Sequence, residues 1–125
     1  MNLVDSCGWL EYFADGPGAD FFADAIENTD QLLVPTICLY EVFKAVQRQR
    51  NENSAIEVVA AMQRGKVVDI DTSIALTAAR ISNQIKLPMA DSLILATASL
   101  HKATILTQDS DFDGLEGVKY RKKGS

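Results

Sequence analysis

Five acidic side chains lie at positions where they could work together. Asp5 follows a short apolar run at residues 2–4, and Asp109 and Asp111 follow another at residues 104–106. Asp91 opens an apolar segment with the length of a helix, and Glu41 lies early in a second such segment. If the two short runs are neighbouring parallel strands, the acids converge at the carboxyl edge of one sheet, where open α/β sheets bind ligands.

Four or five carboxylates in one pocket cannot all stay ionised, because like charges a few ångströms apart repel and raise each other's pKa. Bound cations remove this conflict. Oxygen ligands with no histidine or cysteine nearby select Mg²⁺ or Mn²⁺, which retain waters and favour phosphate substrates. Two such ions about 3.5 to 4 Å apart would activate an attacking water and neutralise a departing oxygen. The pattern therefore predicts phosphodiester hydrolysis without a protein nucleophile.

Three of these acids could instead have purely structural roles. Asp91 could stabilise a helix N-terminus by its charge, Asp109 could form a turn, and Asp5 could simply end its strand. Glu41 is harder to explain in this way, because it interrupts an apolar run on a helix that must pack. A buried unpaired charge is costly at such a position. Glu41 therefore favours the functional interpretation.

Other chemical patterns in the sequence are incomplete. Residues 109–114 resemble the start of a calcium-binding loop, but Tyr120 occupies the twelfth position, where a bidentate Glu is required. His101 is the sole histidine, which disfavours a histidine-based ribonuclease and a serine triad. The sequence also lacks a glycine-rich phosphate loop.

Short apolar runs alternate with longer amphipathic segments. The runs are β-branched or leucine-rich, as in parallel strands buried on both faces, and occupy residues 2–4, 32–34, 67–70 and 104–106, with a weaker run at 118–120. Turn and capping residues between them delimit six expected helices: one capped by Ser6 and stopped by Gly16-Pro17-Gly18, residues 19–27, residues 36–50, one ended by Gly65, one capped by Asp71, and residues 90–101. The order βααβααβααβ predicts an α/β fold, a three-layer α/β/α sandwich around a four- to five-stranded parallel sheet.

Helical spacing also predicts which faces of two helices are buried. In the helix ended by Gly65, the inner stripe is expected to contain Ile56, Val59, Ala60 and Gln63. In the helix capped by Asp71, the inner stripe is expected to contain Ile74, Ala78, Ile81 and Ile85.

Length and composition indicate one globular domain over residues 1–125. The chain is 47% hydrophobic and 23% charged, and it can bury a core. No apolar run approaches the roughly 20 residues that span a bilayer, and Asp5 interrupts the N-terminus before a signal-peptide core could form. We therefore expect a cytoplasmic protein without a membrane partner. Cys7 and Cys38 are too few for a disulfide framework and are expected to be free thiols in the core.

The net charge of −5 is unevenly distributed along the chain. Residues 1–43 contain eight acids and no lysine or arginine, so all twelve basic residues lie from Lys44 onward. Basic clusters at residues 44–50 and 119–123 could meet phosphates or could be solvated surface. Composition therefore leaves RNA open as a partner without supporting it.

Taken together, four segments resemble the PIN-domain ribonucleases of the VapC toxin type. Any one segment is weak evidence, but all four occur in this order, at this spacing, and cover essentially the whole chain. The segments are Leu3-Val4-Asp5-Ser6, Pro35-Thr36-Ile37 through Glu41-Val42, Ala90-Asp91-Ser92-Leu93-Ile94-Leu95-Ala96-Thr97-Ala98, and Leu106-Thr107-Gln108-Asp109-Ser110-Asp111-Phe112.

The resemblance implies a PIN-like fold with an acidic pocket that holds Mg²⁺ or Mn²⁺. It also implies endonucleolytic RNA cleavage that blocks translation, a homodimer, and inhibition by a cognate antitoxin bound in a groove beside the site. Two hydroxyl residues would orient carboxylates or water. The residues that match the family's site are the acids Asp5, Glu41, Asp91 and Asp109, the auxiliary acid Asp111, and the hydroxyl residues Ser6 and Thr107.

Two other functions remain open from the sequence. A signalling receiver is a five-stranded α/β domain of similar length that also binds Mg²⁺, and Asp71 could be its phosphoacceptor, but no lysine follows a convincing fifth strand in a suitable place. A catalytically silent PIN-like module could bind RNA without cutting it. The presence of all the acids disfavours this second alternative.

Overall fold

Five parallel strands form one sheet, in the order β3-β2-β1-β4-β5, in the computed structural model, which describes residues 1–124. The strands are β1 (Asn2–Val4), β2 (Leu32–Pro35), β3 (Lys66–Val68), β4 (Thr104–Thr107) and β5 (Val118–Tyr120). The α-helices are α1 (Ser6–Phe13), α2 (Ala19–Glu27), α3 (Thr36–Gln49), α4 (Glu52–Met62), α5 (Thr72–Ile85) and α6 (Met89–His101). No helix within residues 1–124 has both the length and the apolar content needed to cross a bilayer.

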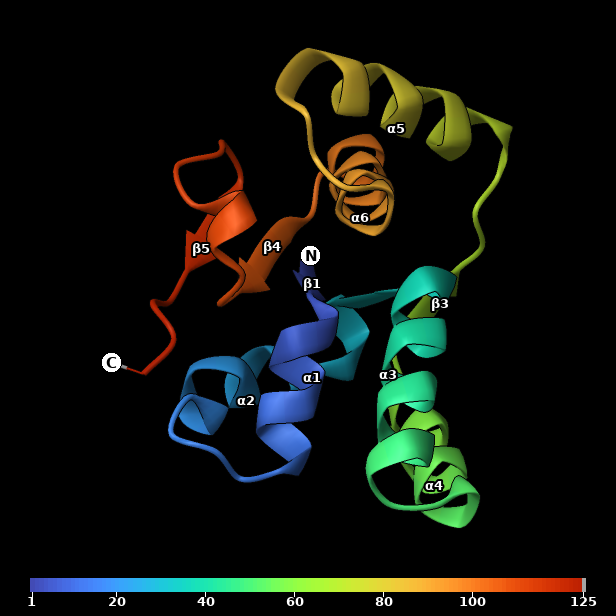
Figure 1. Cartoon of the computed structure of the whole chain (residues 1–125), viewed down its shortest axis with the longest axis vertical. Coiled ribbons are helices and arrows are strands. Elements are labelled where there is room, and N and C mark those ends of the chain that lie inside the picture. The colour runs from blue at the N-terminus through green and yellow to red at the C-terminus, as the bar shows by residue number, and fades with distance from the viewer. Residues whose placement is uncertain (125) are drawn as a thin grey trace.

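The sheet lies between two layers of helices, with α5 and α6 on one side and α1 to α4 on the other (Figure 1). From β1 the chain moves outward to β2 and β3, then crosses back to place β4 on the opposite side of β1. The strand order therefore changes direction between β1 and β4, and open α/β sheets bind ligands beyond the carboxyl ends of such a strand pair. This arrangement confirms the predicted three-layer α/β/α fold.

The ends of the helices follow local sequence signals, with one correction. Asp71 caps α5 as predicted, because its carboxylate accepts a hydrogen bond of 2.9 Å from Ile74 N. The cap of α1 is Asp5 rather than the predicted Ser6, since Asp5 Oδ1 accepts a hydrogen bond of 2.7 Å from Ser6 N. Ser6 is already the first helical residue, and its hydroxyl is bonded to Glu41 instead.

The central strands supply the middle of the core. Leu3, Val4 and Leu33 are fully buried, as expected for strands covered on both faces. The edge strand β3 departs from this expectation, because Val67 is 37% exposed and Lys66 is exposed. The strand predicted over residues 67–70 begins one residue earlier and ends at Val68, directly before Asp69.

The buried face of α4 differs from the predicted one. Ala55 and Met62 are fully buried, whereas Ile56 is 53% exposed and Gln63 lies beyond the last helical residue. The physical reason is that α4 packs against α3 rather than directly on the sheet, so α3 selects the face that is covered. On α5, Ile74 and Ala78 are buried as predicted, but Ile85 is 47% exposed.

Candidate metal and active site

Asp5 directly follows the carboxyl end of β1, beside the neighbouring strand β4, and is buried. Its backbone N–H donates to Leu106 O at 3.0 Å, which ties the residue to β4. Its Oδ1 accepts a hydrogen bond from Ser6 N at 2.7 Å, and its Oδ2 accepts one from Thr107 Oγ1 at 2.8 Å. Donors from α1 and β4 therefore hold the carboxylate in one orientation.

Thr107, the last residue of β4, connects Asp5 with Asp109. Its buried hydroxyl donates to Asp5 and accepts a hydrogen bond of 2.9 Å from Asp109 N. A hydroxyl can donate once and accept at the same time, so one side chain positions two acids.

Glu41 is joined to the site through Ser6. The Ser6 hydroxyl donates to Glu41 Oε1 at 2.6 Å. Glu41 lies on α3, which begins directly after the carboxyl end of β2. The hydrogen bond therefore links the acid of α3 to the residue next to Asp5.

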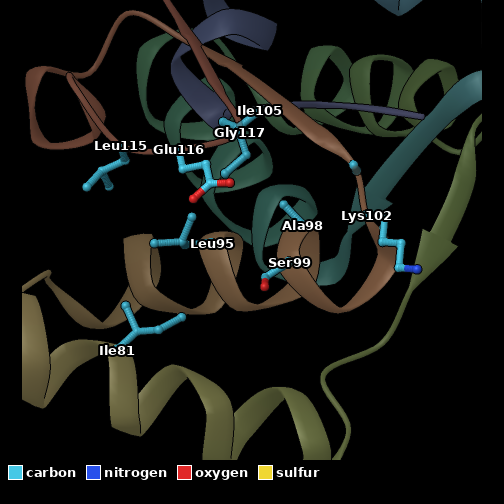
Figure 2. A pocket seen from close by; sticks show the side chains of 10 residues that line it. Ile81, Leu95, Ala98, Ser99, Lys102, Ile105, Leu115, Glu116 and Gly117 are labelled. Atoms are coloured by element: carbon cyan, nitrogen blue, oxygen red, sulfur yellow. The ribbon is translucent and has the colours of Figure 1, made fainter.

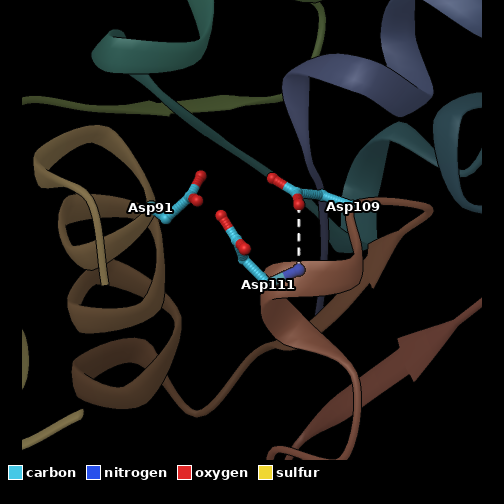
Figure 3. A group of neighbouring side chains, drawn as sticks. All are labelled: Asp91, Asp109 and Asp111. Carbon is cyan, nitrogen blue, oxygen red and sulfur yellow. Dashed lines mark hydrogen bonds between the residues drawn. The ribbon is translucent and has the colours of Figure 1, made fainter. Parts of the chain in front are cut away.

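Asp91, Asp109 and Asp111 form what we call the acidic group, with one carboxylate oxygen from each lying within 4.8 Å of the others. Asp91 comes from the first turn of α6, and the other two come from the segment after β4. In Figure 3 the Asp91 and Asp111 carboxylates face each other, and Asp111 N donates to Asp109 Oδ1 at 2.9 Å. A short 3-10 helix at Ser110–Phe112, capped by Asp109, turns Asp111 back toward Asp91.

Burial and the crowding of negative charge raise the pKa values of two aspartates. Burial, followed by the charges of Asp109 and Asp5, raises the pKa of Asp91 to about 8. Burial also raises the pKa of Asp5, partly offset by the hydrogen bonds from Thr107 and Ser6. A divalent cation beside these oxygens would offset the repulsion. The donor set consists of hard oxygen ligands and fits Mg²⁺ or Mn²⁺.

Cys7 is a site residue that the sequence analysis missed. We expected no cysteine near the acids, but the Cys7 thiol donates to Asp5 Oδ2 at 3.4 Å and lies 3.5 Å from Thr107 Oγ1. Burial, followed by the charge of Asp5, raises its pKa to about 12, so the group is a neutral thiol rather than a thiolate ligand. Its position two residues after Asp5, in the first turn of a helix, was the available signal. Both cysteines are free thiols as predicted, but only Cys38 is fully buried.

The five predicted acids are not all equally close to one another. The acidic group contains Asp91, Asp109 and Asp111, whereas Asp5 and Glu41 lie outside that group of mutually close oxygens. Asp5 is nevertheless near enough for its charge to raise the pKa of Asp91, and the charge of Glu41 likewise acts on Asp5. The five acids thus share one edge of the sheet, while their catalytic and metal-binding roles stay predictions.

A hollow of about 450 Å³ elsewhere on the molecule lacks such a set of groups (Figure 2). It lies between α5, α6 and the segment before β5, where Ile81, Leu95 and Leu115 are among its lining residues. Its charged lining residues, Lys102 and Glu116, are well separated in Figure 2. This hollow offers no cluster of ionisable groups comparable to the acidic group.

Several solved structures have a fold similar to that of this chain. A chain of a toxin-antitoxin complex from Klebsiella pneumoniae matches with a TM-score of 0.81 and 24% identity, over 95% of this chain and 96% of that one. VapC20 from Mycobacterium tuberculosis, described as a sarcin-ricin loop cleaving toxin, matches with a TM-score of 0.75 and 12% identity, over 93% and 95%. FitAcB from Neisseria gonorrhoeae matches with a TM-score of 0.73 and 20% identity, over 96% of each chain.

Sequence comparison identifies the family. A search of curated proteins finds no match. The family model for the PIN domain, however, matches residues 3–118, which include every acid of the site, the whole of β2, β3 and β4, and parts of β1 and β5. The chain therefore belongs to the PIN-domain family.

Proposed function

We propose that this chain is a Mg²⁺- or Mn²⁺-dependent endoribonuclease of the VapC toxin type. The observation that carries the proposal is the acidic group at the carboxyl edge of β1 and β4, with Asp5 linked to it through Thr107. The match to the PIN-domain family and the likeness to toxin structures support the same activity.

The residues that would hold the metal ions are Asp5, Glu41, Asp91, Asp109 and Asp111. When bound, a pair of such ions would activate a water for in-line attack on the phosphodiester and neutralise the departing oxygen. Because the pKa of Asp91 is raised to about 8 in the metal-free protein, its carboxyl holds a proton at neutral pH. That proton has to leave when the group becomes a ligand, so metal binding should release protons.

The hydroxyl residues would orient the acids rather than react. Thr107 holds Asp5 Oδ2 and the backbone of Asp109, and Ser6 holds Glu41 Oε1. Hydrogen bonds of this kind fix the direction of ligand oxygens before the metal arrives. This positioning role agrees with the one that the family resemblance implies for both residues.

We further propose that a cognate antitoxin regulates the chain. Apolar side chains of α1, α3 and α4 line a hollow of about 240 Å³, where Leu10, Val46 and Val58 meet. Nearer the start of α3, Tyr40, Phe43 and Val59 line a second hollow of about 400 Å³. An amphipathic helix of an antitoxin would bury these surfaces, and the similar chain from Klebsiella pneumoniae is part of a toxin-antitoxin complex.

We also propose that the chain forms a homodimer and acts in the cytoplasm. Ala75, Ala79 and Leu93 line an apolar hollow of about 310 Å³ between α5 and α6, and Met89 at its rim is 74% exposed. A second copy of the chain would cover this surface. The composition, typical of a globular domain, supports a protein that works in the cytoplasm.

The receiver alternative loses its support at Asp71. A phosphoacceptor must lie beside the metal, but the exposed Asp71 caps α5, where its carboxylate accepts a hydrogen bond from Ile74 N. It also follows the edge strand β3, which lies two positions from β1 and three from β4 in the sheet. The acidic group is therefore the better candidate for chemistry.

The test is to incubate the purified chain with total RNA, with Mg²⁺ or with EDTA, and to map new 5′ ends. We expect discrete new ends that require Mg²⁺ and disappear in Asp91→Asn. Asp30→Asn is the matched control, because Asp30 is an exposed acid before β2, at the opposite edge of the sheet. Equal cleavage by Asp91→Asn, or full cleavage in EDTA, would contradict the proposal.

A further inference from the structure

We propose that a hollow beside the acidic group holds the RNA nucleotide next to the scissile phosphate, an inference that rests on the proposed function. The hollow has a volume of about 480 Å³, and its lining includes Asp109, Tyr120, Lys122 and Lys123. In this proposal the two lysines bind the phosphate of that nucleotide and Tyr120 contacts its base.

The hollow borders the acidic site, because the two have residues in common. Asp109 belongs to the acidic group and also lines the hollow. Cys7, which contacts Asp5 and Thr107, lines the hollow as well. A polynucleotide with one phosphate at the acidic group would therefore place an adjacent nucleotide within this space.

The register of the sheet explains why lysines reach this position. Tyr120 pairs with Thr107, and Arg121 N donates to Thr107 O at 2.9 Å, so β5 runs alongside β4 up to the site. The chain therefore leaves β5 at the same edge as Asp109. Lys122 and Lys123 follow directly and are exposed.

The charges of the hollow suit a phosphate rather than an apolar or cationic ligand. Lysine ammonium groups are compact point charges that bind phosphates. They stand next to an acidic group that would by itself repel the RNA backbone. This placement gives a role to the basic residues that follow an acidic N-terminal third, and it supplies a path for RNA on a molecule with a net charge of −5.

Tyr120 supplies an aromatic ring in the same hollow, where it is half-buried. Unpaired bases of RNA stack on tyrosine rings, and this interaction tolerates every base because each has a flat face. The buried Gln108, which also lines the hollow, accepts a hydrogen bond of 3.3 Å from Arg121 Nη1, and this bond ties the segment after β5 to the wall of the hollow.

The test measures binding of a fluorescein-labelled single-stranded 12-nucleotide RNA of mixed sequence by anisotropy at several salt concentrations. All proteins carry Asp91→Asn and are measured in Mg²⁺, so that the RNA is not cut. Replacing Lys122 and Lys123 with Gln should weaken binding and make the slope of log K against log salt shallower by about 0.7, because the two lysines bind a single phosphate. Lys66→Gln with Lys102→Gln removes the same charge from exposed residues at the opposite edge and should leave the slope unchanged.

The aromatic contact is tested separately. Tyr120→Ala should weaken binding roughly ten-fold, whereas Tyr120→Phe keeps the ring and should bind like the parent. Thermal unfolding of every variant shows whether the fold is intact. A loss of affinity in Tyr120→Phe equal to that in Tyr120→Ala would contradict stacking.

Two results would overturn the assignment of the hollow. The first is a salt slope that is the same when Lys122 and Lys123 are replaced as when Lys66 and Lys102 are replaced. The second is unchanged RNA binding together with weaker binding of a polyglutamate peptide, which would assign the hollow to an acidic protein segment. Cleavage of total RNA by the unmodified chain separates this proposal from the proposed function. Cleavage by that chain, with an unaltered salt slope in the lysine variant, overturns only the assignment of the hollow. Absence of cleavage overturns both proposals.

Discussion

At the scale of single residues, Asp91 makes the metal-free protein sensitive to pH. Its pKa is about 8 in the folded protein, whereas its ordinary value is 3.8. Between about pH 4 and pH 8, the folded state therefore binds more protons than the unfolded state. Stability of the metal-free protein should therefore fall as the pH rises through this window. The raised pKa of Asp5 acts in the same direction.

Asp91→Asn should remove much of this dependence. We expect thermal unfolding in EDTA to occur at a higher temperature in Asp91→Asn than in the parent at pH 8.5, with the difference shrinking toward pH 5. Circular dichroism at a series of pH values measures this, and Asp30→Asn should follow the parent. A lower unfolding temperature for Asp91→Asn at pH 8.5 would show that Asp91 is not strained by neighbouring charges.

Thr107 is the residue whose loss should separate positioning from folding. Thr107→Val keeps the shape of the side chain but removes the hydroxyl that holds Asp5 and Asp109. Losing such an orienting group typically costs 10- to 100-fold in metal affinity or activity, so we expect a drop of about that size in the RNA cleavage rate. Thr107→Ser retains the hydroxyl and should recover most of the rate, and equal loss in both variants would argue against orientation.

Sequence was sufficient to nominate the acids, because each follows a strand or lies in the first two turns of a helix at the sheet's carboxyl edge. It was insufficient for the hydrogen-bond partners. Cys7 and Asp5 are two residues apart, but the contact of Cys7 with Thr107 spans 100 residues and depends on the pairing of β1 with β4. Contacts of that kind follow from strand order, which the sequence pattern does not specify.

At the scale of elements, α1 positions Asp5 by packing tightly on the sheet. A Cβ atom added at Gly8 would lie 2.6 Å from the Phe22 ring and 2.7 Å from Val4 Cγ1, both of them fully buried. Replacing Gly with Ala inside a helix normally stabilises by about 1 kcal/mol, whereas overpacking a core costs about 1 to 3 kcal/mol. We expect the packing cost to be the larger effect here.

Gly8→Ala should therefore destabilise the protein by about 1 kcal/mol in urea unfolding, against its helix propensity. Phe22→Leu provides the matched test, because it creates room beside the added methyl group. The double variant should lose less stability than the sum of the two single variants. Stabilisation by Gly8→Ala alone would mean that α1 is free to shift.

The types and order of the elements could be read from the sequence, but two buried faces could not. The stripe predicted for α4 failed because α4 packs on α3, and a hydrophobic period does not reveal which neighbour a helix covers. The strand β3 was expected to be buried on both faces and is a partly exposed edge strand. Both errors concern position within the fold rather than local preference.

At the scale of the whole molecule, the proposed homodimer can be tested at the hollow between α5 and α6. Ala79→Glu would place a charge in this apolar surface with little change in helix propensity. We expect light scattering after size exclusion to show a dimer for the parent and a monomer for Ala79→Glu. Ala60→Glu, at an exposed position of α4, should remain a dimer. Dimers in both variants would place the interface elsewhere.

The central claim is that aspartates from distant parts of the chain hold a divalent cation together. Titration with Mn²⁺, followed by electron paramagnetic resonance of the free ion, tests it without any assumption about RNA. The account predicts that the parent and Asp30→Asn bind Mn²⁺ alike, and that Asp91→Asn and Asp109→Asn each bind it at least about ten-fold more weakly. Equal Mn²⁺ affinity in all four proteins would contradict the account.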